Sequence, residues 1–147
     1  MHPQLKLDRQ LCFRLYTASR LMTQAYRPLL EPLGLTYPQY LVMMAMWEQD
    51  HQLVGDLCRK LVLDTNTVTP LLKRMEAGGL IVRTHGVVDG RQTLVSLSRK
   101  GRQLEDQAKE VPACMVKSMD PAPMDAAQAA DLAVALDRII DVLKKNL

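Results

Sequence analysis

Three cysteines are the residues of this 147-residue chain whose side chains could do redox chemistry. Cys12, Cys58 and Cys114 lie far apart in the sequence, so none belongs to a C-x-x-C pair. No histidine pair has the spacing of a zinc site either, and we expect no metal and no other cofactor. An odd, sparse set of cysteines is not the disulfide framework of a secreted protein. Any cysteine chemistry must therefore involve individual thiols.

The first of these cysteines begins a polar stripe on a long helix that we predict over residues 7–30. At about 100° per residue, one narrow face of that helix carries Cys12, Tyr16, Ser19, Thr23 and Tyr26. Tyr16 is one turn from Cys12 and could touch it. Tyr26 is roughly 21 Å from Cys12 along the helix axis, so it could reach only the Cys12 of an antiparallel partner subunit. A buried, inert Cys12 is the alternative interpretation.

A second group of residues has the chemistry of nucleic-acid binding. We predict a helix that is capped by Asp64 or Thr65 and runs to about Ala77, with one apolar face. Small hydroxyl and amide groups near its start could contact base edges in a major groove, and cations further along suit phosphate oxygens. The predicted DNA-binding residues of this helix are Thr65, Asn66, Thr67, Thr69, Lys73 and Arg74.

A β-hairpin, or wing, is predicted around the turn-rich segment 85–92. Arg91 at its tip could enter the adjacent minor groove, with Asp89 holding the guanidinium in place. Residues 59–102 hold nine basic and three acidic groups, whereas residues 103–147 have a net charge of −3. Phosphate binding needs such a localised basic region. The alternative interpretation is that the helix, the hairpin and the basic region over 59–102 form an ordinary solvated surface.

The helix and hairpin resemble the MarR family of winged helix-turn-helix transcription factors. The resemblance rests on LLKRMEAGGLIVR at 71–83, DGR at 89–91, VSLS at 95–98 and Gly101. It extends from Leu7 to the last helix of the chain. It implies a homodimer that binds palindromic double-stranded operator DNA, often as a repressor, with the first and last helices forming the dimer interface.

Residues 11–16 and 26–40 are similar to one branch of that family, the organic hydroperoxide resistance regulators (OhrR). The similarity implies that an organic hydroperoxide oxidises Cys12 to a sulfenic acid and that the repressor then leaves DNA. It also implies that Tyr26 and Tyr37 bond the sensor thiolate of the partner subunit. Tyrosine hydroxyls that donate to a thiolate stabilise the form that attacks peroxide.

The other two cysteines receive different roles. Some members of the branch hold a resolving cysteine about a hundred residues after the sensor, and the resemblance gives Cys114 this position. A disulfide between Cys12 and Cys114 of two subunits is therefore a hypothesis, and a passive core role for Cys114 is its alternative. Cys58 falls on the inward face of its predicted helix, and we assign it to packing.

The elements that position these groups follow from hydrophobic periodicity and from caps at Thr36 and Ser98. Predicted helices cover 7–30, 37–49, 53–61, 65–77, 98–119 with an interruption at Pro112, and about 124–146; predicted strands cover 80–84 and 93–97. We expect a mainly α fold with a small β-hairpin wing. The expected organisation is one MarR-like domain over 1–147, with dimerisation helices at about 7–30 and 98–146 and the winged helix-turn-helix at about 37–97.

Several other classes of protein fit the sequence less well. No segment has the roughly 18 uninterrupted apolar residues of a membrane span, and the polar N-terminus lacks the apolar run of a signal peptide, so we expect a cytoplasmic protein with no membrane partner. A thiol-dependent peroxidase would leave the basic winged motif without a use, so we predict that the chain is not an enzyme. The main alternative is a MarR-type regulator that responds to a phenolic or aromatic acid in a pocket between its dimerisation and DNA-binding parts.

Overall fold

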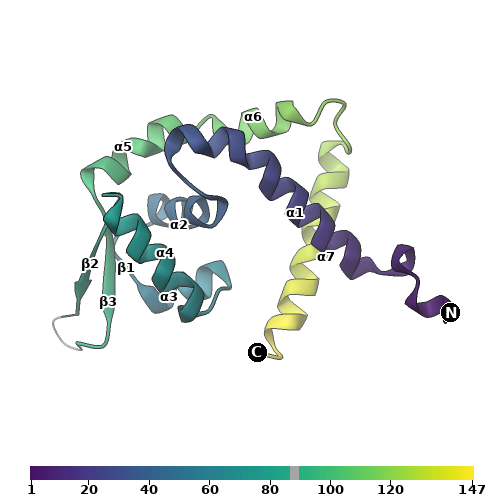
Figure 1. Cartoon of the computed structure of the whole chain (residues 1–147), viewed down its shortest axis with the longest axis horizontal. Coiled ribbons are helices and arrows are strands. Elements are labelled where there is room, and N and C mark those ends of the chain that lie inside the picture. The colour runs from purple at the N-terminus through teal and green to yellow at the C-terminus, as the bar shows by residue number, and fades with distance from the viewer. Residues whose placement is uncertain (87–89) are drawn as a thin grey trace. The chain divides into compact units, whose positions relative to one another are not determined.

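Two stretches of the chain form separate units in the computed structural model, Met1–Pro112 and Ala113–Leu147 (Figure 1). The structure describes residues 1–86 and 90–147. The first unit contains three 3-10 turns, η1 (Pro3–Leu5), η2 (Leu7–Arg9) and η3 (Glu31–Leu33), and α1 (Leu11–Leu30), α2 (Tyr37–Glu48), β1 (Gln52–Leu53), α3 (Val54–Leu61), α4 (Thr65–Ala77), β2 (Ile81–His85), β3 (Thr93–Leu97) and α5 (Arg99–Ala108). Helix α6 (Val111–Ser118) crosses the boundary, and the second unit contains α7 (Ala126–Lys144). The mainly helical fold with a small wing is confirmed, and the assignment of the outer helices to dimerisation stays a prediction.

Side-chain caps decide where most of the helices begin. The Thr36 hydroxyl accepts a hydrogen bond from the Gln39 amide at the start of α2, and the Gln39 side chain bonds back to the Thr36 amide. Asp64 caps α4, and Ser98 caps α5 by accepting from the Gly101 amide at 2.9 Å. Each cap satisfies one of the amides that a helix start leaves without an internal partner. The predicted caps at Thr36 and Ser98 are confirmed.

Two predicted helix boundaries were wrong. Helix α1 begins at Leu11 and not at residue 7, because Gln10 is extended and its side chain donates to the carbonyls of Gln4 and Lys6 in the preceding turns. The helix predicted over 98–119 breaks after Ala108, before it reaches Pro112. Pro112 lies instead in the first turn of α6, where its missing amide hydrogen costs nothing.

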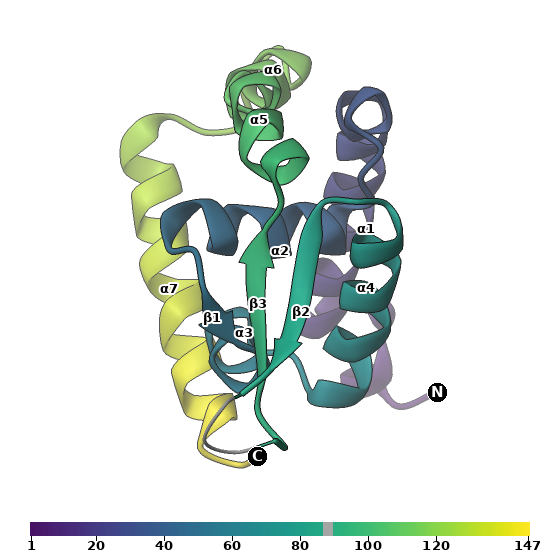
Figure 2. The ribbon, with the colours of Figure 1, turned by 90° about the vertical axis from the view of Figure 1, so that its left-hand side faces the viewer.

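The wing belongs to a three-stranded antiparallel sheet with the order β1-β3-β2 (Figure 2). Strands β2 and β3 pair from Ile81↔Leu97 to His85↔Thr93, and β1 adds the pair Gln52↔Val95. The sequence analysis did not predict β1. Beyond the end of β1, Asp50 takes the place of a strand partner, because its carboxylate accepts a hydrogen bond from the Leu97 amide at 2.8 Å.

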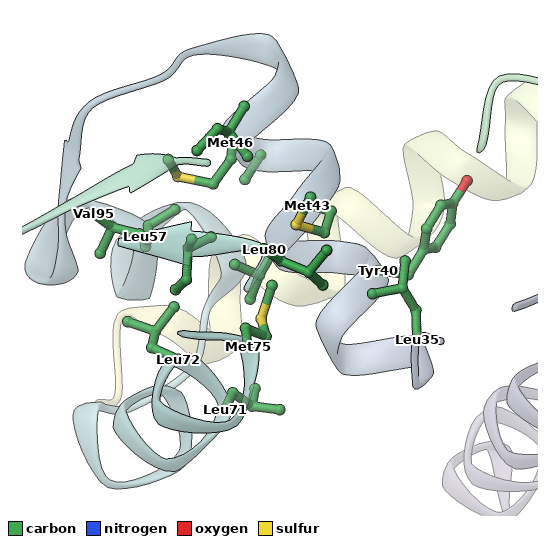
Figure 3. Close-up of a cluster of buried hydrophobic side chains, with 14 of the residues drawn as sticks. Leu35, Tyr40, Met43, Met46, Leu57, Leu71, Leu72, Met75, Leu80 and Val95 are labelled. Atoms are coloured by element: carbon green, nitrogen blue, oxygen red, sulfur yellow. The ribbon is translucent and has the colours of Figure 1, made fainter. Parts of the chain in front are cut away.

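The core of the first unit lies between α2, α4 and the sheet (Figure 3). Its fully buried side chains are mostly Leu, Met and Val. They include Val42, Met43 and Met46 of α2, Leu57 of α3, Val68, Leu72 and Met75 of α4, and Ile81 and Val95 of the sheet. The helix that carries the predicted DNA-binding residues is thus held by one buried face.

Helices α3 and α4 end in the same way with different residues. After α4, Gly79 adopts φ 78° while the Leu80 amide bonds back to the Met75 carbonyl at 3.0 Å. After α3, Val62 adopts φ 54° while the Leu63 amide bonds back to the Cys58 carbonyl at 3.1 Å. Glycine takes this left-handed conformation freely, whereas a β-branched residue is strained there. The turn between α3 and α4 therefore stores backbone strain at Val62.

The searched helices of the described residues include none that is both long and apolar enough to cross a membrane.

Gly101 marks a close approach of α5 to the turn between α4 and β2. A Cβ at this position would lie 2.1 Å from the Leu80 carbonyl oxygen, and the Gly101 carbonyl itself accepts a hydrogen bond from the Trp47 indole at 3.0 Å. We expect Gly101→Ala to lower the free energy of unfolding by about 2–3 kcal/mol, because α5 must move away from the Leu80 backbone. Urea unfolding at fixed protein concentration measures the change.

Gly55 provides the matched control, since it also lies in the first turns of a helix. A Cβ there would meet only the Arg59 side chain, at 3.6 Å. Gly55→Ala should therefore be neutral or raise the free energy of unfolding by up to about 1 kcal/mol. Equal destabilisation by the two substitutions would contradict the proposed contact.

Candidate functional site

Helix α4 carries most of the predicted DNA-binding residues on its exposed side. The Asp64 carboxylate accepts from the Thr67 amide at 2.9 Å and fixes its N-terminus. Its apolar residues, Val68, Leu71, Leu72 and Met75, are buried. Of the predicted contacts, Thr65, Asn66, Thr67, Lys73 and Arg74 are exposed and Thr69 is half-buried. The predicted separation of this helix into a buried apolar face and an exposed polar face is therefore confirmed. Contact of the exposed residues with DNA stays a prediction.

The exposed residues of α4 point in three directions. Thr65 and Thr69 line a cavity of about 400 Å³ between α3, α4 and the sheet. Arg74 lines a separate pocket of about 210 Å³ with Lys100 of α5. These flanks lie to either side of the outermost strip of the helix.

The outermost strip of α4 consists of Asn66, Pro70 and Lys73. Successive residues of an α-helix are about 100° apart, so these three lie opposite the buried face. All three are exposed. The sequence analysis singled out Asn66 and Lys73 and missed Pro70, although the spacing of four residues from Asn66 to Pro70 already placed them on one face.

The wing contributes one described residue to the predicted DNA-binding set. Arg91 is exposed next to the first residues of β3 and lines the 400 Å³ cavity with Arg59 and Arg83. Two of these guanidinium groups are paired with carboxylates, Arg59 with Asp56 of the same cavity and Arg83 with Glu76. Asp89 lies outside the described residues, and its predicted pairing with Arg91 stays a prediction.

One ion pair ties α4 to the wing. The Glu76 carboxylate accepts from the Arg83 backbone amide at 2.8 Å and from the Arg83 Nη2 and Nε atoms at 3.2 and 3.4 Å. The bonds from the Arg83 amide and side chain hold the pKa of Glu76 below its ordinary value of 4.5. Because Arg83 is in β2, helix α4 and the first wing strand are connected directly.

The predicted sensor residue Cys12 is exposed in the first turn of α1. Gln10 precedes the helix and makes no side-chain cap, so no side chain of that residue occupies the first amides of α1. Tyr16, one turn further on, is 67% exposed. In this chain Cys12 is therefore not a buried core cysteine, and the predicted interaction with Tyr16 is not among the described hydrogen bonds of the chain.

The predicted thiolate-binding tyrosines meet near the other end of α1. The rings of Tyr26 and Tyr37 are 4.9 Å apart between centroids, and both side chains are half-buried. Thr36, which caps α2, and η3, which follows α1, bring the two residues together. The structure thus places side by side two of the residues that the resemblance assigned to one site.

A third tyrosine, which the sequence analysis missed, supports this pair. Tyr40 is only 3% exposed and belongs to the buried cluster of Figure 3. Its ring centroid lies 6.0 Å from that of Tyr26 and 6.3 Å from that of Tyr37. Burial raises the pKa of Tyr37 and of Tyr40, and the neighbouring tyrosines raise both further. These phenols therefore keep their protons and remain hydrogen-bond donors. The sequence could have indicated this role of Tyr40, because Tyr40 lies three residues after Tyr37 on the same predicted helix.

The other two cysteines lie in different surroundings. Cys58 is half-buried against the core, with its sulfur 3.9 Å from the Thr65 hydroxyl, which confirms its assignment to packing. Cys114 is exposed in the second unit, so its alternative as a core residue is wrong. Among the residues searched, 1–86 and 90–147, no group of three or more histidine, cysteine, aspartate and glutamate side chains could hold a metal ion.

Sequence comparisons find transcriptional regulators. A family model described as "Transcriptional regulator SarA/Rot" matches residues 24–108. The chain is 46% identical over 108 residues to the organic hydroperoxide resistance transcriptional regulator of Bacillus subtilis (strain 168), which covers 74% of each chain. It is 39% identical over 108 residues to the HTH-type transcriptional regulator MgrA of Staphylococcus aureus, covering 73% of this chain and 74% of MgrA.

Solved structures give a similar result over nearly the whole chain. Reduced AbfR bound to DNA matches with a TM-score of 0.81 and 33% identity, covering 97% of this chain and 95% of that chain. AbfR of Staphylococcus epidermidis has also been solved in a disulfide-formed state, which matches with a TM-score of 0.62 and 33% identity over 97% of this chain and 92% of that chain. The relatives named here are regulators of transcription.

The Glu76–Arg83 pair predicts how stability depends on pH. Because the pKa of Glu76 is lowered in the folded chain, its stabilising contribution is complete above 4.5 and is lost as the pH falls through the folded value. The wild type should therefore lose more stability below pH 4.5 than Glu76→Gln does. Urea unfolding of both proteins over a series of pH values gives the two curves.

Asp106 is the control for this prediction, because its pair with Lys109 is an exposed contact between neighbouring turns at 3.7 Å. Such surface pairs contribute little. Asp106→Asn should follow the wild-type curve. If Glu76→Gln also follows the wild type at every pH, the carboxylate does not hold the wing to α4.

Proposed function

Because this chain belongs to the MarR family of winged-helix transcriptional regulators, we propose that it is a homodimer that releases operator DNA when an organic hydroperoxide oxidises Cys12. The observation that carries the proposal is the pairing of Tyr26 and Tyr37 at one end of α1, with the exposed Cys12 at the other end. Membership of the family makes the chain a DNA-binding regulator and not an enzyme.

Operator binding is supported by the exposed face of α4 and by the basic wing. Asn66 and Thr67 lie in the first turn of α4, which is the part of a recognition helix that contacts base edges. Lys73 and Arg74 suit phosphates, and Arg91 suits the minor groove. AbfR, which is similar over nearly the whole chain, has been solved bound to DNA.

A homodimer is supported by apolar side chains that a single chain leaves exposed. On α1 these include Leu11, Leu21 and Met22, and on α7 they include Leu132, Ile140 and Leu143. Several large apolar side chains exposed on one helix, as on each of these two, are typical of an interface. We assign it to a second copy of the chain, which would place two α4 helices against successive half-sites of a palindromic operator.

The thiol site of the proposal needs both subunits. Cys12 and Tyr26 of one α1 are separated by roughly 21 Å along the helix axis, so their contact requires an antiparallel α1 from the partner. Burial raises the pKa of Tyr37, so its hydroxyl is a protonated donor, and the Tyr26 ring lies beside it. The first amides of α1 lack a side-chain cap from Gln10. Both groups of donors would stabilise the Cys12 thiolate. Tyr16, on the same stripe as Cys12, is the third proposed donor.

The proposed chemistry has two steps. The Cys12 thiolate attacks the outer oxygen of an organic hydroperoxide, the O–O bond breaks, and the alkoxide takes a proton and leaves as an alcohol. Cys12 is then a sulfenic acid. In the second step the Cys114 thiol of the partner displaces its hydroxyl as water, and a disulfide forms between the subunits. The exposure of Cys12 and Cys114 and the disulfide-formed state of AbfR support this sequence.

The disulfide would act on DNA binding through geometry. A disulfide requires the two Cα atoms to approach within roughly 7 Å. If the reduced dimer holds the two cysteines further apart, closing the bond must move the helices that carry them. That motion would shift the two α4 helices away from their half-sites.

A second candidate signal is a small phenolic or aromatic acid. Thr23 and Arg27 of α1 and Tyr37 of α2 line a cavity of about 270 Å³, and the guanidinium would suit a carboxylate. A protein with Cys12 and Cys114 both replaced by serine distinguishes the two signals. Loss of operator binding when an aromatic carboxylic acid is titrated into this variant would favour the second candidate.

Cys12→Ser tests the sensor assignment. The wild type should bind its operator at least about tenfold more weakly after treatment with an alkyl hydroperoxide, a change of about 1.4 kcal/mol. Cys12→Ser should bind with unchanged affinity after the same treatment, because a hydroxyl does not attack peroxide. Operator gel shifts of reduced and treated protein measure both affinities.

Cys58→Ser is the matched control and should respond to peroxide like the wild type, because Cys58 lies against the core. Release of DNA by peroxide-treated Cys12→Ser would show that the trigger lies elsewhere.

Cys114→Ser tests the intersubunit bridge. On a non-reducing gel, the peroxide-treated wild type should migrate at twice the monomer mass of 16.6 kDa. Cys12→Ser and Cys114→Ser should both stay at the monomer mass, whereas Cys58→Ser should migrate as the dimer. A treated wild type that stays at the monomer mass would rule out the bridge and leave the sulfenic acid as the oxidised end state.

A further inference from the structure

Pro70 is placed where a DNA-binding helix would meet base pairs. It lies inside α4, four residues after Asn66 and three before Lys73, and all three side chains are exposed opposite the buried face. A proline inside a helix is costly, because it removes one internal hydrogen bond and its ring crowds the preceding turn. Packing does not explain Pro70, since its ring is not buried in the core.

The proline changes the chemistry of the outer strip of α4. In a regular helix the amide of residue 70 would donate to the carbonyl of residue 66. Pro70 has no amide hydrogen, so the Asn66 carbonyl lacks its regular donor. The outer strip therefore presents a backbone acceptor at Asn66 and, one turn further on, a rigid apolar ring.

The first amides of α4 do not replace the missing donor to the Asn66 carbonyl, because they bond to Asp64. The Thr67 amide donates to the Asp64 carboxylate and the Val68 amide donates to the Asp64 carbonyl. The capping residue thus uses donors at the start of α4, whereas the acceptor four residues before Pro70 is left without its regular partner. Between Asp64 and Lys73, the strip offers an acceptor and an apolar surface.

An A·T base pair is the pair whose major-groove edge matches both groups. Adenine presents its N6 amino donor there and thymine presents its C5 methyl group. A C·G pair presents an amino donor but no methyl group. We propose that the Asn66 carbonyl accepts a hydrogen bond from an adenine amino group while the Pro70 ring packs on the methyl group of the paired thymine, so that this part of α4 specifies an A·T pair in each half-site.

This inference rests on the proposed binding of α4 in a major groove. It deepens that function, because the other outward groups of α4 are side chains on flexible stems, whereas the carbonyl and the ring are fixed to the helix. Fixed groups lose little conformational freedom on binding and therefore discriminate well between neighbouring chemical groups.

Base analogues test the proposal with the full-length reduced protein. A duplex selected by this protein from a random-sequence pool serves as the operator. Each thymine is replaced in turn by deoxyuridine, which removes only the methyl group, and each adenine by deoxynebularine, which removes the amino group. At one A·T pair per half-site, the wild type should lose roughly fourfold in affinity on removal of the methyl group and roughly tenfold on removal of the amino group.

Pro70→Ala is the diagnostic variant, because it shrinks the apolar contact and restores the amide that bonds the Asn66 carbonyl. At the same A·T pair, either analogue should lower the affinity of Pro70→Ala by less than about twofold. Lys73→Met is the matched control on the same strip. Lys73→Met should bind all duplexes more weakly by the same factor, and the dependence of its affinity on salt should fall by about one phosphate contact. The factor by which each base analogue lowers its affinity should equal that of the wild type.

The outcomes separate the two proposals. Absence of binding to any duplex would overturn both the operator-binding function and this inference. Specific binding in which no single A·T pair responds to both analogues, or in which Pro70→Ala loses as much as the wild type at that pair, would overturn the inference alone.

Discussion

The fixed orientation of α4 is the constraint on which the rest of the first unit depends. Four apolar side chains of α4 are buried against α2, α3 and the sheet, and a helix of thirteen residues held by that many contacts cannot rotate without opening the core. Asp64 fixes its start, Gly79 turns the chain at its end, and Glu76 attaches it to β2. The outward direction of Asn66, Pro70 and Lys73 is therefore a consequence of packing on the opposite side.

Helix α1 is placed differently, because most of its residues are exposed and, of its described residues, only Leu30 is buried. Cys12 and Tyr16 are exposed, and the tyrosine pair lies at the far end of the same helix. A straight α-helix does not bring its two ends together, so a site that uses both ends has to be made by two copies. In the proposed function the same event, the docking of two α1 helices, completes the thiol site and aligns the two recognition helices.

Local signals in the sequence predicted much of this fold. Thr36 and Ser98 are side-chain signals that act within a few residues, and they cap their helices as predicted. Features that depend on distant residues were missed. Strand β1 is only two residues long and exists because β3 pairs with it, and the Arg83 side chain is fixed by Glu76 across the turn between α4 and β2. The break at Gln10 was missed because its side chain bonds to earlier carbonyls, which hydrophobic periodicity does not report.

Helix α2 connects the two functional regions of the first unit. Tyr37 and Tyr40 lie in its first turn, and Met43 and Met46 lie in the core that holds α4. All four residues belong to one rigid helix, although Tyr37 and Met46, nine residues apart, lie on opposite sides of it. Under the proposed mechanism, loss of the bond between the Tyr37 hydroxyl and the partner's thiolate frees the start of α2, and a packed core transmits displacement of α2 because it resists local deformation. The bistable element would then be the packing of α2 on α4, and α4 is the element that operator binding requires to stay in place.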